Sequence, residues 1–308
     1  MARPDRTLAA APTGDQADNQ ADNDAAVAGL DALDAPATAT TRTGRGRLFG
    51  FLRRAAPPVL AIVAIVGIWQ ALWAAAIWPE FQLPAPRDVW AQIAERIPTG
   101  EITGFLWISV HRAVIGFLIA LAVAVPLGLL IANIGVLRRG IGPLITGLQS
   151  LPSVAWVPAA ILWFGLTDPA IYFVVLLGAV PSIANGLVSG IDQIPPILPR
   201  VGKVLGAGRI AGIRHIMLPA ALPGFLGGLK QGWAFSWRSL MAAELIATSP
   251  QLGTGLGQFL HNGHSLNDMS MVMAAIALIF FVGVGIELLV FRPLERTVLH
   301  ARGLAAAL

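Results

Sequence analysis

The 308-residue chain contains no cysteine and few charged side chains. The absence of thiols excludes disulfide bonds, thiolate nucleophiles and cysteine-ligated metal centres. Charged residues make up 12% of the sequence, against about 25% in a typical soluble domain, whereas apolar residues make up 56%. The net charge of +4 does not indicate nucleic-acid binding, because Lys and Arg are spread between apolar runs rather than gathered on one face among stacking aromatics. The composition predicts an integral membrane protein.

The amino-terminal region differs from the rest of the chain. Residues 1–45 are rich in Ala, Thr and Asp, and we expect a disordered tail. Residues 46–57 form a basic juxtamembrane segment, which either lies along an anionic membrane surface or is the positive flank of the first membrane helix. The first apolar run begins near Pro57 and is long enough to span a bilayer, unlike a cleaved signal peptide. Residues 58–308 are therefore predicted to be the membrane domain.

Six apolar segments are long enough to cross a membrane, since about 20 helical residues span the roughly 30 Å of hydrocarbon. They are residues 58–77, 106–133, 141–163, 169–190, 219–247 and 270–291. None shows the period-two alternation of a barrel strand, and backbone groups in lipid must be paired within the protein. The sequence therefore predicts an all-α membrane protein, a six-helix transmembrane bundle.

Basic residues are concentrated in alternate connections between these segments. They precede the first span, occupy the second and fourth connections and follow the last span: Arg42, Arg45, Arg47, Arg53, Arg54, Arg138, Arg139, Arg200, Lys203, Arg209, Arg214, Arg292, Arg296 and Arg302. The last connection, between Thr248 and Ser270, has neither Lys nor Arg. By the positive-inside rule, both termini are predicted to be cytoplasmic.

The connection at about residues 195–218 is the longest on the side predicted to be cytoplasmic. It opens with three prolines and continues as a short helical pattern interrupted by glycines. The chain lacks the G-x-x-x-x-G-K-[ST] pattern of a phosphate-binding loop, so ATP-driven transport would require nucleotide on another chain.

The spacing of Gly206, Ile216, Leu218 and Pro219 resembles the EAA loop of binding-protein-dependent ABC importer permeases. That pattern is E-A-A, three residues, G, nine residues and I-x-L-P. Four more segments carry the likeness: LQSLPSVAWVPAAILWFG at 148–165, LPAALPGFLGGLK at 218–230, AAEL at 242–245 and GTGLG at 253–257. Together they resemble the nitrate, sulfonate and taurine group of these permeases.

This resemblance implies a coupling helix that docks in a groove of an ATPase subunit. The resemblance assigns the following residues of this chain to the coupling loop: Arg200, Lys203, Gly206, Ala207, Ile216, Leu218 and Pro219. The start of the loop departs from the motif, because Arg200, Val201 and Gly202 replace E-A-A. The charge reversal at Arg200 either weakens docking or indicates a partner with an acidic complement.

The resemblance also implies the MetI-like type I ABC importer permease fold and a transport role without catalysis by this chain. The implied partners are a second permease copy or a sister permease, two ATPase subunits that carry ATP and Mg, an extracytoplasmic substrate-binding protein and membrane lipid, with no nucleic acid. No cofactor is expected on this chain. The implied location is the plasma membrane of a prokaryote, and the implied solute is small, such as a sulfonate, nitrate or taurine.

Three ionisable residues, Lys230, Arg238 and Glu244, lie inside the fifth predicted span, where they usually face a bundle interior or a water-filled path. At 100° per residue, Lys230, Trp237 and Glu244 share one stripe, which faces either the translocation pathway or a dimer interface. Alternatively, Lys230 snorkels to the headgroups and Glu244 is neutralised within the bundle. A cationic site would suit an oxyanion, but the nearby Glu244 argues against inferring specificity from charge alone.

The third predicted span contains Pro152 and Pro158, one on each side of Trp156, and a helix there is predicted to kink. Carbonyls freed by a kink need partners near a cavity, and Gln149, Ser150 and Ser153 offer polar groups. Trp156 alternatively packs in the bundle or at the membrane interface. The candidates for the translocation pathway are Gln149, Ser150, Pro152, Trp156, Trp237, Arg238 and Glu244.

No catalytic or metal site is expected. His261 and His264 have an H-x-x-H spacing but no third ligand nearby, and no hydrolytic signature is present. Two other functions were considered. A secondary transporter driven by an ion gradient would show inverted repeats with interrupted helices, and none is visible. A channel or membrane scaffold would not need a docking loop.

Overall fold

The computed structural model describes residues 44–300. The chain forms two units, residues 1–65 and 66–308, which are described separately. The described part of the first unit is the beginning of helix α2 (Gly44–Ala74), whose last residues belong to the second unit. The predicted tail at 1–45 lies outside the described residues except for its last two positions, and the basic segment 46–57 is helical.

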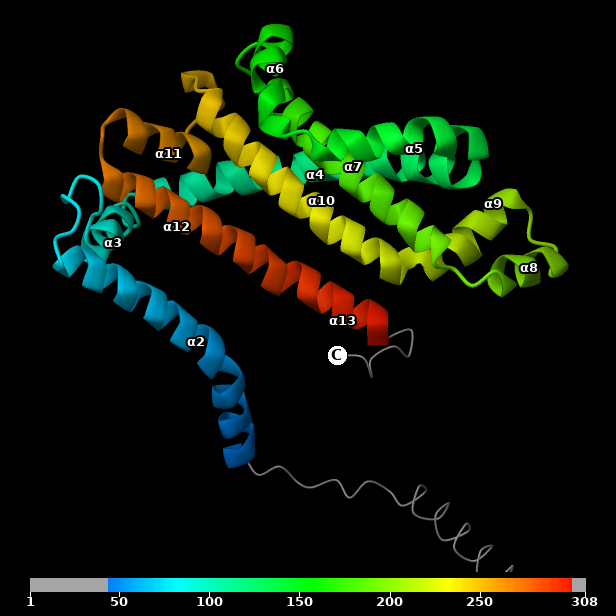
Figure 1. Ribbon diagram of the computed structural model, residues 1–308, viewed down its shortest axis with the longest axis horizontal. Helices are drawn as coiled ribbons and strands as arrows, with labels where there is room; N and C mark the ends of the chain where they lie inside the picture. The colour runs from blue at the N-terminus through cyan, green and yellow to red at the C-terminus, as the bar shows by residue number, and fades with distance from the viewer. Residues whose placement is uncertain (1–43, 301–308) are drawn as a thin grey trace, which may run out of the picture. The chain divides into compact units, whose positions relative to one another are not determined.

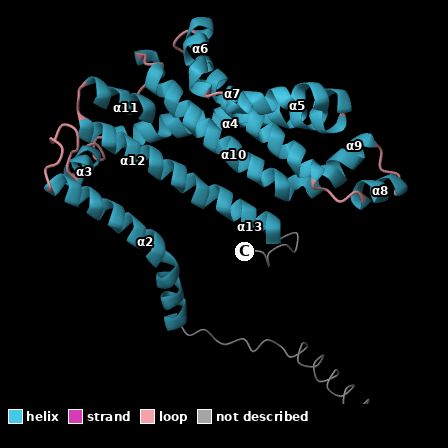
Figure 2. Cartoon of the chain, in the orientation of Figure 1, coloured by secondary structure: helices cyan, strands magenta, loops and turns pink. Residues whose placement is uncertain are grey.

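The second unit is built from helices and short loops (Figure 1). After the end of α2 they are α3 (Pro86–Ala94), α4 (Glu101–Asn133), α5 (Gly135–Ser150), η1 (Ser153–Trp156), α6 (Val157–Phe164), α7 (Asp168–Asp192), α8 (Ile197–Val204), α9 (Arg209–Gly212), η2 (Ile213–Met217), α10 (Leu218–Ile246), η3 (Pro250–Leu252), α11 (Leu256–Ser265), α12 (Met269–Ile286), η4 (Glu287–Phe291) and α13 (Arg292–His300). No strand occurs between residues 44 and 300 (Figure 2), which agrees with the prediction of an all-α protein.

Four helical segments of the described chain are long and apolar enough to cross a membrane: Glu101–Asn133, Asp168–Asp192, Ile210–Ile246 and Met269–His300. A bent pair, α5 with η1 and α6, makes a fifth if it is counted as one span. A shorter apolar helix, Val59–Ala74, lies where the first span was predicted. Helices therefore occur at the predicted positions, and the boundaries of the four long segments differ from the predicted ones by up to nine residues.

The third predicted span, residues 141–163, is not a continuous helix. It is broken between Ser150 and Ser153 and bends there by 94°. Pro152 has no N–H to donate and restricts Leu151 to an extended conformation, which Leu151 adopts with φ −77° and ψ 130°. The predicted kink is thus concentrated at one proline, while Pro143 and the proline at position 158 are accommodated inside α5 and in the first turn of α6.

Helices α7 and α10 lie side by side and form the most extensive helix–helix contact of the unit (Figure 1). Small residues face each other along it. A Cβ added to Gly228 would lie 2.5 Å from the Cα of Gly186, and one added to Gly224 would lie 2.9 Å from the Cα of Gly190. Glycine is required at this contact because the two backbones meet without room for a methyl group.

Two hydrophobic clusters surround this helix pair. The larger one joins α3, α4, α7, α10, α11 and α12 through buried side chains such as Phe259, Leu240 and Ile171. The smaller one joins α4, α7 and α10 around Ile183 and Leu187. Helices α3 and α11 were not predicted, because each has only about ten residues and lies between predicted spans.

Candidate functional site

An open cavity of about 310 Å³ lies at the break between α5 and η1. Its walls are Leu148, Gln149, Ser150, Leu151, Pro152, Ser153 and Val154 from the break, Leu177 and Gly178 from α7, and Phe235, Arg238, Ser239 and Ala242 from α10. Four of the predicted pathway residues, Gln149, Ser150, Pro152 and Arg238, are therefore brought together in one cavity, here named the bend pocket.

The polar side chains of the bend pocket are held by hydrogen bonds to neighbouring helices. The Oγ atoms of Ser153 and Ser239 lie 2.6 Å apart, which joins the broken span to α10. The amide of Gln149 donates to Ser182 Oγ at 3.1 Å. The amide of Asn185 in turn donates to Gln149 Oε1 at 3.0 Å. The bend is thus fixed to α7 and α10 by polar contacts that an apolar bundle would lack.

Arg238 is the charged residue of the bend pocket, and its side chain is exposed. Its guanidinium lies 4.5 Å from the ring centroid of Phe235, and its Nε donates to the carbonyl oxygen of Ala234 at 3.3 Å. The ion pairs found among the described residues do not include Arg238. The pocket therefore carries a positive charge without a carboxylate partner among residues 44–300.

The other three predicted pathway residues lie outside the bend pocket. Trp156 is half-buried at the end of η1. Trp237 is buried, with its ring stacked against Trp233 at 6.5 Å between centroids. It also faces α12, where a Cβ on Gly283 would lie 3.6 Å from the indole nitrogen of Trp237. Glu244 is completely buried.

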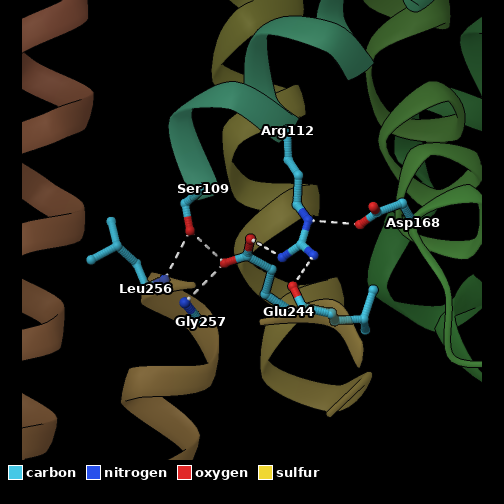
Figure 3. A network of polar contacts seen from close by, with 7 residues as sticks. Ser109, Arg112, Asp168, Glu244, Leu256 and Gly257 are labelled. Atoms are coloured by element: carbon cyan, nitrogen blue, oxygen red, sulfur yellow. Dashed lines mark hydrogen bonds and ion pairs between the residues drawn. The ribbon is translucent and has the colours of Figure 1, made fainter. Parts of the chain in front are cut away.

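Glu244 is the centre of a buried polar network that connects three helices (Figure 3). Its carboxylate accepts hydrogen bonds from Ser109 Oγ at 2.7 Å, from Arg112 at 3.2 Å and from the backbone N–H of Gly257 at 3.1 Å. Ser109 and Arg112 come from α4, and Gly257 is in the first turn of α11. Of the alternatives considered for Glu244, the structure shows pairing within the bundle, and the partner is a positive charge.

All three nitrogens of the Arg112 guanidinium take part in this network. Besides Glu244, it binds Asp168 through Nε at 2.8 Å and the carbonyl oxygen of Leu252 through NH2 at 2.5 Å. Arg112 was not singled out from the sequence, although it is an arginine inside the second predicted span. The rule that drew attention to Lys230, Arg238 and Glu244 applies equally to it.

The network explains the glycines of the GTGLG motif. A Cβ on Gly255 would lie 2.6 Å from a carboxylate oxygen of Glu244, and one on Gly257 would lie 2.5 Å from the Glu244 Cβ. Gly253 has φ +67°, which favours glycine. These glycines let the chain pass close to the buried carboxylate, which sits at the positive end of the α11 dipole.

Lys230 is paired with two acidic side chains. Its Nζ lies 2.8 Å from Glu287 in η4 and 3.1 Å from Glu295 in α13. The predicted stripe of Lys230, Trp237 and Glu244 therefore faces neighbouring helices of the same chain: η4 and α13 at Lys230, α12 at Trp237 and α4 at Glu244.

The predicted coupling loop contains α8, α9 and η2. Arg200 and Lys203 are exposed on α8, and Gly206 follows it with φ +79°, a conformation that favours glycine. The N–H of Ala207 donates to the carbonyl oxygen of Gly202 at 2.9 Å. A groove of about 600 Å³ is lined by Asn133, Pro199, Gly202, Lys203, Ala207, Gly208, Gly212, Ile213, Ile216 and Met217.

Apolar side chains of this loop are exposed. Val204, Leu205 and Ile210 are 87%, 79% and 81% exposed, which is unusual for three apolar residues so close together in a solvated connection. Ile216 instead packs against Gly202, so that η2 and α8 are in contact. Leu218 and Pro219 begin α10 directly after η2, within a helical segment that runs from Ile210 to Ile246.

The two histidines lie on α11. Nε2 of His261 is 3.3 Å from Ser265 Oγ. Within the part of the chain that the structure describes, no group of three His, Cys, Asp or Glu residues is placed to hold a metal ion.

Comparison with known proteins places residues 124–296 in a match to the family model described as "Binding-protein-dependent transport system inner membrane component". A nitrate import permease of Leptolyngbya laminosa is 28% identical and covers 78% of this chain and 86% of the relative. A permease assigned to aliphatic sulfonate transport in Bacillus subtilis is 29% identical, over 85% of this chain and 91% of the relative. A taurine transport permease of Escherichia coli is 25% identical, over 74% and 83%.

A solved structure agrees with the arrangement of helices. A chain of the MetNI methionine ABC transporter, crystallised in an inward-facing form, superposes with a TM-score of 0.55 and 19% identity, and the match covers 64% of this chain and 95% of that chain. At that identity the likeness concerns the fold, which is the MetI-like permease fold.

Proposed function

Since the chain belongs to the family of binding-protein-dependent transport system inner membrane components, we propose that it is the membrane-spanning subunit of an ATP-driven importer for a small oxyanion or a small molecule that carries an oxyanion group. The family consists of transport subunits rather than enzymes, and it implies ATPase subunits and a substrate-binding protein as partners. Nitrate, sulfonate or taurine is the proposed class of solute, because permeases for these molecules align over most of the chain.

The observation that carries this proposal is the exposed apolar surface of α8 and α9. Val204, Leu205 and Ile210 project from a short helical connection between two membrane spans. The chain has no phosphate-binding loop of its own, so ATP and Mg belong to the proposed ATPase partner. Burying those three side chains against a partner would stabilise the complex by about 1.5–3 kcal/mol for each.

The connection between this surface and the bend pocket gives the proposed coupling mechanism. From Ile210 to Ile246 the chain is helical without interruption, through α9, η2 and α10. Ile216 packs on Gly202 of α8 near the beginning of this segment, and Arg238 lies on the bend pocket farther along it. Movement of α8 by the ATPase would therefore be transmitted along one helix to the pocket, alternating its access between the two sides of the membrane.

The proposed assembly has two permease copies, identical or sister chains, in the plasma membrane of a prokaryote. One chain presents one docking surface and an open bend pocket, whereas the proposed complex has two ATPase subunits. The Lys and Arg bias supports a cytoplasmic location for the α8–α9 loop and for both termini.

The test is co-purification of the ATPase subunit with the permease, using Val204→Asp combined with Leu205→Asp. Burying two carboxylates in an apolar interface is costly, so recovery of the ATPase should fall at least tenfold. The matched control is Thr297→Asp, another exposed position on the side predicted to be cytoplasmic. Undiminished recovery with the double variant would refute docking through α8, and ion-driven uptake without any ATPase would refute the importer.

A further inference from the structure

Three Lys or Arg residues lie within helices α4, α7, α10 and α12, and two of them are paired with carboxylates. Arg112 binds Glu244 and Asp168, and Lys230 binds Glu287 and Glu295. Arg238 is the third, and among the described residues it makes a ring contact and a bond to a backbone carbonyl but no ion pair. Among the described residues, acidic side chains therefore neutralise two of the three cations in these four helices and not the third.

An uncompensated arginine at membrane depth is costly, and such residues usually mark the path of a charged ligand. The contact of Arg238 with Phe235 orients the guanidinium but does not neutralise it. Its side chain is exposed, and it lines the bend pocket rather than a packed interface of this chain. The charge is thus available to a ligand in that pocket.

Glu244 does not oppose this charge. It lies six residues farther along α10, but it is completely buried and its carboxylate is held by Arg112, Ser109 and the N–H of Gly257. The sequence alone leaves open whether Glu244 would cancel a cationic site nearby. In the structure, Glu244 is paired with Arg112 instead. Arg238 is therefore the charged side chain among the residues that line the bend pocket.

The other walls of the bend pocket suit a small anion with an apolar body. Ser150, Ser153 and Ser239 line the same pocket as Arg238, while Leu177 and Ala242 are apolar. The volume of about 310 Å³ is at the small end of the range of roughly 300–1,000 Å³ for ligand pockets. A guanidinium with neighbouring hydroxyls matches the oxygens of a nitrate or sulfonate group.

We propose that the bend pocket is a binding site for the anionic group of the transported solute, with Arg238 as its charged ligand-contacting residue. This inference rests on the proposed transport function and adds the residue that selects for negative charge. Arg238 offers its two terminal nitrogens to the oxyanion, while Nε stays bonded to the backbone of α10.

The absence of native cysteine makes a direct test possible, because one introduced thiol is the only reactive sulfhydryl in the chain. Ser150→Cys places a thiol at the pocket wall. The full-length variant in phosphatidylcholine nanodiscs is treated with an anionic or a cationic methanethiosulfonate, sulfonatoethyl or trimethylammonioethyl. The thiolate attacks the reagent's sulfenyl sulfur, a mixed disulfide forms, and methanesulfinate leaves.

The expected result is that the ratio of the anionic to the cationic rate falls about tenfold or more when Arg238→Gln is added. A unit charge about 6 Å away changes the energy of each reagent, in opposite directions, by about 0.7 kcal/mol even at the dielectric constant of bulk water, about 80. Arg238→Lys keeps the charge and should retain most of the ratio. Ser265→Cys, an exposed position on α11, is the control, and Arg238→Gln should not change its ratio. Gel filtration confirms that each variant is folded.

The source of the anion is distinguished by two further arms at constant ionic strength. Added ethanesulfonate should slow the anionic reagent at Ser150→Cys, and this protection should disappear with Arg238→Gln. If phosphatidylglycerol in the nanodisc suppresses the anionic reagent and ethanesulfonate does not, the site binds lipid headgroups and the proposal is wrong. A rate ratio that does not depend on Arg238 also overturns it. None of these arms requires the ATPase, so failure here differs from failure of the co-purification test.

Discussion

The buried pair of Arg112 and Glu244 gives the sharpest prediction about stability. Glu244 is 0% exposed and Arg112 is 5% exposed, so neither charge has access to water if its partner is lost. Breaking a buried ion pair by removing one partner costs about 3–5 kcal/mol, because the remaining charge is left uncompensated. We therefore expect Glu244→Leu, which removes the carboxylate and roughly keeps the volume, to lower the free energy of unfolding by about that amount.

The structure suggests where within this range the cost should lie. After the loss of Glu244, Arg112 keeps Asp168 and the carbonyl oxygen of Leu252. Asp168 is half-exposed, with 48% of its side chain accessible, so the ion pair that remains is partly screened by solvent. The N–H of Gly257 and the hydroxyl of Ser109 also lose an acceptor. The value should be close to the lower limit, about 3 kcal/mol, with a further contribution from the unpaired donors of roughly 1 kcal/mol.

A double-mutant cycle in detergent micelles measures this. Arg112→Met and Glu244→Leu are compared with the double variant by urea unfolding followed through tryptophan fluorescence. The double variant should be less destabilised than the sum of the single ones, with a coupling energy of about 2 kcal/mol or more. Glu295→Gln is the control, since Lys230 keeps Glu287 and partly exposed pairs contribute about 0–1 kcal/mol. Additive single effects, or a Glu244→Leu cost under about 1 kcal/mol, would refute the reasoning.

Three other outcomes are expected. Gly228→Ala should destabilise the protein by about 1–3 kcal/mol, because the new Cβ would lie 2.5 Å from the Cα of Gly186. The control Gly227→Ala has open space around the new Cβ, so it should be neutral or stabilising by up to about 1 kcal/mol. Thermal unfolding compares the two variants. Gly255→Ala, with its Cβ 2.6 Å from the Glu244 carboxylate, should lower the melting temperature, and a wild-type value would contradict the explanation of the GTGLG motif. Burial of Asp268 opposes its ionisation, but hydrogen bonds from the Ser270 hydroxyl and the Met271 N–H outweigh this and hold the pKa of Asp268 below its ordinary value of 3.8. Ionised Asp268 should therefore stabilise the folded protein above the pKa that Asp268 has in the unfolded chain, and this contribution should be lost as the pH falls through the lower folded pKa. In a plot of melting temperature against pH, Asp268→Asn should show a smaller fall at acid pH than the wild type.

Much of the fold is predictable because membrane helices need long apolar runs. The helices α4, α7, α10 and α12 occur within a few residues of their predicted positions, since hydropathy alone determines which segments can cross hydrocarbon. The 94° bend was predicted only as a kink at prolines, because the direction of a bend depends on what packs around it. The short helices α3 and α11 were not predicted, because ten residues between spans give no hydropathy signal.

The candidate site was predictable in its residue types but not in its groupings. Gln149, Ser150, Pro152 and Arg238 share the bend pocket, as a pathway interpretation requires, and their role in transport stays a prediction. Helical periodicity placed Lys230, Trp237 and Glu244 on one stripe, but it cannot say which helix covers that stripe. The partners Arg112, Glu287 and Glu295 are distant in sequence, and only the tertiary fold brings them to α10.

The glycine contacts between α7 and α10 have a consequence for how this molecule can move. Gly186 and Gly190 meet Gly228 and Gly224 backbone to backbone, and Gly178 makes room for Ser239 farther along the same pair. A slide of α10 along α7 by part of a turn would drive larger side chains into spaces that admit only hydrogen atoms. A slide by a whole turn, about 5.4 Å, would bring Gly186 opposite Gly232 and Gly190 opposite Gly228. Small shear movements between the two helices are therefore opposed, and a relative shift of the pair is expected to proceed in steps of one turn.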